Sequence, residues 1–93
     1  MATNFETVEK ENISSLIFPS IEVLEDVSAI YQRKNDLNRA LTLGNLEHSK
    51  IKIFFEDNFS KKMVETTVWA ITDKSVVLKK GIRIPIHRII MSI

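Results

Sequence analysis

The sequence predicts an α+β fold in which one N-terminal helix, over about residues 20–43, precedes a small antiparallel barrel of five short strands, over about residues 48–93. Apolar residues recur every three or four positions in the first region, which is typical of a helix. From Lys50 onward they alternate with polar residues, and short turns separate the apolar stretches, as in small barrels. A length of 93 residues with a hydrophobic fraction of 44% fits a single domain.

The first part of the chain is predicted to be a mobile arm over residues 1–18. Residues 1–12 are polar, and chain ends without a buried anchor are usually poorly ordered. The apolar patch at residues 13–18 fits either a strand or a single helical turn, and the pattern does not choose between them.

The helical part is predicted over residues 19–45. Ser20, directly after Pro19, is suited to accept hydrogen bonds from the first turn, and the acids that follow suit the positive end of a helix dipole. Gly44 is predicted to end the helix, because glycine adopts the left-handed cap conformation without strain. A break near Asn35-Asp36 is an open alternative.

The barrel is predicted over residues 46–93. The segment 63–72 is rich in β-branched and aromatic residues, so it is predicted to be a strand. Both of its faces are apolar, so it is either central or bent so that its ends serve different sides of the barrel. Trp69 in this segment is expected to be core rather than a binding platform. The other four strands are predicted over residues 50–55, 75–79, 82–87 and 89–93.

Charge is divided unevenly along the chain. Residues 1–30 carry six acids and one base, whereas residues 31–93 carry twelve bases and six acids. Three interpretations are open: the acidic half docks on the basic half, both parts are simply solvated, or the basic part is a nucleic-acid surface. The residues predicted to bind nucleic acid or an acidic protein are Lys79, Lys80, Arg83, His87 and Arg88.

Catalysis and metal binding are not expected. The chain has no cysteine, only two histidines and only two glycines, so it offers no clustered metal ligands and no glycine-rich phosphate loop. No cofactor is predicted. No apolar run approaches the roughly 20 residues of a membrane span, and no secretory signal is recognised, so a cytoplasmic location without a membrane partner is expected.

The strand pattern from Lys50 to Ile93 resembles the small barrels of the Sm/Hfq type, and in part SH3-like barrels. The stretches KIKIFFEDN, VWAIT, SVVLKK and IPIHRIIMSI carry this likeness. The sequence pattern LGN…VETTVW…IPIHRI also resembles that of uncharacterised small proteins, chiefly of Bacteroidetes. The first resemblance implies RNA binding, with His87-Arg88 in the place of the basic, histidine-containing strand junction of Hfq. The loop at residues 57–62 departs from the Sm pattern because it lacks a glycine.

The predicted function is therefore a non-enzymatic binding module that favours RNA or single-stranded DNA. The alternative is a protein-interaction or self-assembling module, because the apolar last strand leaves a sheet edge that needs a partner or a cover. In that alternative the chain forms a homo-oligomer or binds an acidic protein.

Overall fold

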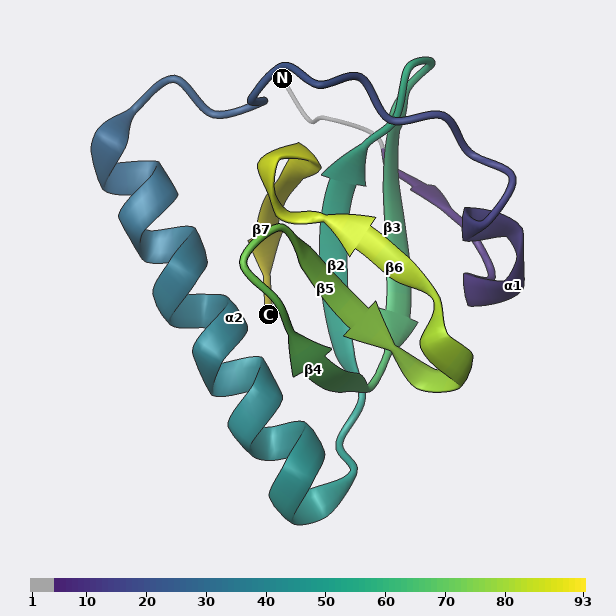
Figure 1. The fold of residues 1–93 in the computed structure, drawn as a ribbon, viewed down its shortest axis with the longest axis vertical. Coiled ribbons are helices and arrows are strands. Elements are labelled where there is room, and N and C mark those ends of the chain that lie inside the picture. The colour runs from purple at the N-terminus through teal and green to yellow at the C-terminus, as the bar shows by residue number, and fades with distance from the viewer. Residues whose placement is uncertain (1–4) are drawn as a thin grey trace.

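A computed structural model describes residues 5–93 as one long helix lying beside two β-sheets (Figure 1). The elements, in chain order, are β1 (Glu6–Thr7), α1 (Lys10–Ile13), α2 (Val27–Glu47), β2 (Ile51–Glu56), β3 (Lys61–Thr66), β4 (Val68–Ile71), β5 (Ser75–Leu78), the 3₁₀ turn η1 (Lys79–Gly81), β6 (Arg83–Pro85), the 3₁₀ turn η2 (Ile86–Arg88) and β7 (Ile89–Ser92). The predicted α+β class is confirmed.

The N-terminal segment lies against the sheet instead of forming the arm that its composition predicts. β1 pairs in parallel with β3, with Glu6 opposite Lys62. α1 is a single turn, and Ile13 at its end is only 1% exposed, so an apolar anchor fixes this segment. Residues 1–4 of the predicted arm lie outside the described residues.

Residues 14–26, which we call the strap, contain no helix or strand and connect α1 to α2 across the top of the molecule in Figure 1. The predicted helix start at Pro19-Ser20 is wrong, because the backbone of the strap makes hydrogen bonds elsewhere. The Val23 N–H donates to the His87 carbonyl at 2.9 Å. The helix begins seven residues later than predicted, where the Asp26 carboxylate accepts the Ser28 N–H at 3.1 Å.

The C-terminal end of α2 also differs from the prediction. The helix continues through Gly44 and ends at Glu47, and the next residue, His48, takes the left-handed conformation with φ 55°. Gly44 is needed for a different reason: a Cβ there would collide with the Val68 carbonyl oxygen. The glycine therefore permits close packing of α2 on β4. The break near Asn35-Asp36 does not occur.

The strands form a four-stranded sheet of order β1-β3-β2-β7 and a three-stranded sheet of order β4-β5-β6. The described chain has seven strands rather than five. β1 is additional, and the predicted strand 63–72 divides at Thr67 into β3 and β4. Since β3 and β4 belong to different sheets, the bent alternative describes this segment better than the central one.

The predicted closed barrel is not found, because no ladder within residues 5–93 joins the two sheets. β7 and β4 are edge strands of the two sheets, and both pack against α2. The helix therefore occupies the position in which a closing ladder between these edges would form.

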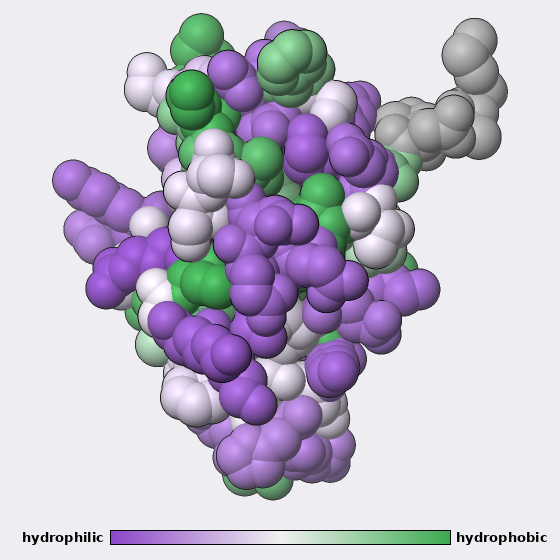
Figure 2. All heavy atoms as spheres, turned by 90° about the vertical axis from the view of Figure 1, so that its right-hand side faces the viewer, coloured by the Kyte–Doolittle hydropathy of each residue, from purple (hydrophilic) through white to green (hydrophobic). Residues whose placement is uncertain are grey.

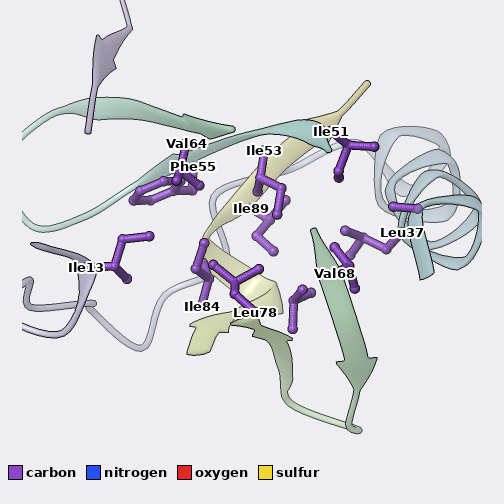
Figure 3. Packing of buried hydrophobic residues seen from close by; sticks show 12 residues of the cluster. Ile13, Leu37, Ile51, Ile53, Phe55, Val64, Val68, Leu78, Ile84 and Ile89 are labelled. Atoms are coloured by element: carbon purple, nitrogen blue, oxygen red, sulfur yellow. The ribbon is translucent and has the colours of Figure 1, made fainter. Parts of the chain in front are cut away.

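Both sheets and both helices contribute to one core. Figure 3 shows Leu37 of α2 beside Val68, and Ile13 of α1 on the side of Phe55. The buried apolar residues are Ile13, Leu37, Ala40, Ile51, Ile53, Phe55, Val64, Val68, Val76, Leu78, Ile84 and Ile89.

Candidate functional site

The five residues predicted to bind a partner do not form one surface. Arg88 is buried in η2, and its guanidinium is used by the fold. It donates three hydrogen bonds to carbonyl oxygens, from Nη1 to Ile21 at 2.7 Å, from Nε to Glu56 at 3.0 Å and from Nη2 to Asp57 at 3.2 Å. Arg88 thus joins the strap to the end of β2, and its donors face the protein.

His87 also holds the strap. Its Nε2 lies 2.9 Å from the Pro19 carbonyl oxygen. A carbonyl only accepts, so Nε2 carries the proton and donates it. The His87 carbonyl in turn accepts the Val23 N–H. The imidazole is therefore engaged on the side that faces the strap.

Arg33 is a third side chain that fixes the strap, and the sequence prediction did not include it. Its guanidinium is buried and forms a two-fold hydrogen bond with the Glu22 carboxylate, with both distances 2.7 Å. The hydrogen bonds from Arg33 lower the pKa of Glu22 below its ordinary value of 4.5. The signal was present, since Arg33 occupies an apolar-face position between Ile30 and Leu37.

A second buried ion pair stabilises the turn between β2 and β3. The Lys62 ammonium lies 3.0 Å from the Asp57 carboxylate, which also accepts the N–H groups of Phe59 and Ser60 at 2.9 Å each. Burial alone would raise the pKa of Asp57, but these N–H groups and Lys62 outweigh it and lower that pKa. This carboxylate and this lysine are structural.

The other three predicted residues are exposed. Lys79 and Lys80 lie on η1, and Arg83 lies on β6. Lys80 and Gly81 have positive φ angles of 68° and 78°, so η1 turns sharply there. Only Lys79 among the five lines a cavity that also contains an exposed aromatic side chain.

That aromatic side chain is Trp69, which is 52% exposed, so its expected place in the core is wrong. The cause lies in the pairing of β4 with β5. Val68 faces Leu78 and Ala70 faces Val77, and the register shifts between them, which leaves Trp69 at a bulge. A bulge re-aims the extra side chain out of the regular alternation, so the indole faces outward.

Trp69 borders a cavity of about 360 Å³, which we call the Trp69 pocket. This volume lies within the range of small-molecule sites, roughly 300–1,000 Å³. Its lining comes from α1 and the residue before it, the segment between α2 and β2, the end of β3, the start of β4 and η1. The lining residues are Glu9, Lys10, His48, Lys50, Glu65, Thr66, Thr67, Trp69 and Lys79.

The close approach of α2 to the β3–β4 junction shapes one wall of the pocket. Gly44 allows the contact, and the left-handed His48 then turns the chain toward β2. The Thr67 hydroxyl donates to the His48 carbonyl at 3.3 Å and closes this corner. The wall is thus built on packed secondary structure.

The charged side chains of the Trp69 pocket are of both signs, and most are not paired with each other. Within residues 5–93, Lys50, Lys79, Glu9 and Glu65 form no ion pair and no side-chain hydrogen bond, whereas Lys10 pairs with Glu11 at 3.3 Å. These groups are therefore available to a ligand. Figure 2 shows the side of the molecule on which α1 and η1 lie, and this side is mostly hydrophilic.

In the described part of the chain, no three His, Asp or Glu side chains gather into a possible metal site. No helix of residues 5–93 has both the length and the apolar character to cross a bilayer.

The fold and the site together define a small α+β protein with an exposed tryptophan over a mixed-charge pocket. Comparison of the chain with protein-family models, with curated proteins and with solved structures found no match. The resemblances to Sm/Hfq-type barrels and to Bacteroidetes proteins stay predictions.

Proposed function

We propose that the protein is a non-enzymatic module that binds single-stranded nucleic acid, RNA or DNA, at the Trp69 pocket. One base stacks on the indole of Trp69, and the adjoining phosphates contact Lys50 and Lys79. Stacking of a base on an aromatic side chain contributes about 1–3 kcal/mol. The observation that carries the proposal is the exposed Trp69 at a bulge, with unpaired lysines in the same cavity.

Lys80 and Arg83 extend the cationic surface from the pocket along η1 and β6, and both are exposed. His87 and Arg88 do not belong to this proposed contact set, because their donors hold the strap. The proposed contact set therefore contains Lys79, Lys80 and Arg83, which the sequence predicted, together with Trp69 and Lys50.

The test is fluorescence anisotropy with labelled mixed-sequence 12-nucleotide RNA and DNA at about 50 mM salt, where phosphate contacts are strong. We expect binding, and we expect Trp69→Ala to weaken it about ten-fold or more. Tyr31→Ala is the matched control, because Tyr31 is a 61% exposed aromatic residue outside the pocket. Absence of binding at tens of micromolar protein, or equal losses in the two variants, would overturn the proposal.

Trp69 is the only tryptophan, so its fluorescence reports on the site directly. Trp69→Ala is expected to lower the free energy of unfolding by less than about 2 kcal/mol, below the roughly 3–5 kcal/mol of a core tryptophan. A loss of binding at nearly unchanged stability separates a contact from a folding defect.

The alternative function is a self-assembling interaction module, and one specific observation favours it. An apolar groove of about 600 Å³ runs between α2 and the β4–β5 turn, and it is bordered by Val27, which is 78% exposed, and by Tyr31. A second copy of the chain would cover this groove. Light scattering after gel filtration tests it: a concentration-dependent dimer that Val27→Glu abolishes supports the alternative, and a monomer at all concentrations contradicts it.

A further inference from the structure

The Trp69 pocket contains acceptors as well as cations. Glu9 and Glu65 line the same cavity as Trp69, and both are exposed at the surface. A phosphate-binding site gains nothing from carboxylates, because like charges repel. Their presence indicates a ligand that brings hydrogen-bond donors together with its negative charge.

Neither carboxylate has an ion-pair or side-chain hydrogen-bond partner among residues 5–93. Glu65 on β3 stands opposite Lys52 on β2, yet the two side chains form no ion pair. Glu9 precedes α1, and its side chain makes no capping hydrogen bond. An ionised carboxylate only accepts hydrogen bonds, so each of these lining residues can accept from donors of a ligand.

The nucleobases differ in what they present to such a group. Guanine has two adjacent donors on its Watson–Crick edge, the N1–H and the 2-amino group, and these match the two oxygens of one carboxylate. Cytosine and adenine each offer one amino group. Uracil offers a single N–H flanked by two carbonyl oxygens, which a carboxylate repels.

We propose that Glu65, assisted by Glu9, makes the Trp69 pocket select guanine over uracil and thymine, with adenine and cytosine between them. The inference rests on the proposed function, because it places the base on Trp69 and the phosphates on the lysines. Glu65 is the principal reader because it lies on a paired strand of the sheet, whereas Glu9 lies outside regular structure. Strand-borne groups are held more precisely than those on loops.

The experiment compares 5′-mononucleotides, which avoid the secondary structure of guanine-rich oligonucleotides. Competition against a bound labelled oligonucleotide gives the affinities of GMP, IMP and UMP. IMP lacks only the 2-amino group of GMP. We expect GMP to bind about ten-fold more tightly than UMP, and IMP to lie clearly closer to UMP than to GMP.

The variant Glu65→Gln separates the recognition of the base from an effect of charge and from a folding defect. The substitution removes a negative charge, so electrostatics alone would strengthen the binding of GMP and of UMP equally. A folding defect would weaken the binding of both nucleotides. If the Glu65 carboxylate recognises the base, Glu65→Gln weakens the binding of GMP about five- to ten-fold and does not weaken the binding of UMP. Glu25→Gln is the matched control, since Glu25 is an exposed carboxylate on the strap.

The outcomes distinguish the inference from the function on which it rests. If oligonucleotides bind through Trp69 but UMP binds as tightly as GMP or more tightly, the guanine selection is overturned and the binding function stands. If Glu65→Gln changes the affinities for GMP and UMP by the same factor, the guanine selection is overturned as well. If no oligonucleotide binds, both proposals are overturned.

Discussion

The strap side of the molecule and the Trp69 pocket use the same side-chain types in opposite ways. On the strap side, Arg33 and Arg88 are buried, and the protein itself satisfies their donors. In the pocket, Lys50 and Lys79 have no partner within residues 5–93. Within residues 5–93, the basic residues therefore divide into cations that hold the fold and exposed cations that the fold does not use. Burial and hydrogen bonding, rather than charge count, separate the two.

The largest expected effect concerns Arg88. Arg88→Ala leaves three carbonyl oxygens without a donor and releases the strap, so we expect a loss of about 3–5 kcal/mol in the free energy of unfolding. Urea denaturation followed by circular dichroism measures it. Arg83→Ala, which removes an exposed arginine on β6, should change stability by no more than about 0.5 kcal/mol. Equal losses in the two variants would remove the distinction between the two groups of cations.

Gly44→Ala tests how the pocket wall is built. Alanine usually stabilises a helix by up to about 1 kcal/mol relative to glycine. Here the added methyl meets the Val68 carbonyl oxygen, so we expect a net loss of about 1–3 kcal/mol in thermal or urea unfolding. Asn45→Ala, at the exposed neighbouring position, should be neutral or stabilising. A Gly44→Ala protein more stable than the parent would contradict the close approach of α2 to β4.

The Glu22–Arg33 pair predicts a dependence of stability on pH. The pKa of Glu22 is lower in the folded state than its ordinary value of 4.5, so the unfolded chain binds the proton more tightly. The stabilisation is therefore present above about pH 4.5 and is lost as the pH falls toward the lowered folded pKa. Glu22→Gln should flatten part of this decline, and Glu25→Gln should not. Urea unfolding between pH 3 and pH 7 measures both curves, and identical curves for the two variants would contradict the role of the pair.

The smallest expected effect concerns Lys79. Lys79→Ala should weaken oligonucleotide binding several-fold and lower the slope of log affinity against log salt by about one. Lys74→Ala, an exposed lysine outside the Trp69 pocket, is the control and should leave both quantities nearly unchanged. Anisotropy titrations between 50 and 200 mM salt provide the comparison. Equal changes in both variants would mean that charge acts without a defined site.

Periodicity predicted the elements better than it predicted their ends. The long helix and the strands after Lys50 follow from residue spacing, which is a local property. The start of α2 does not, because the strap is held by hydrogen bonds from residues distant in the sequence, such as those from His87 to Pro19 and from Arg88 to Ile21. Local sequence also does not predict whether the barrel closes, because closure depends on where α2 packs.

The candidate site was predicted only in part, for a similar reason. Charge predicts Lys79, whereas the apolar strand around Trp69 predicts a place in the core, where a tryptophan in such a strand normally lies. The register shift opposite β5 reverses that assignment, and only the pairing of two strands reveals it. The contacts of His87 and Arg88 with the strap could not be predicted, because the sequence does not show which basic residues find carbonyl partners.

The most direct test of the division between the two regions is a two-dimensional NMR titration with a single-stranded oligonucleotide. We predict that the indole N–H of Trp69 and the amides of Lys50 and Lys79 shift. The amides of the strap, such as Val23, and of His87 should stay in place. Shifts concentrated in the strap and η2, with an unchanged Trp69 indole, would contradict the account.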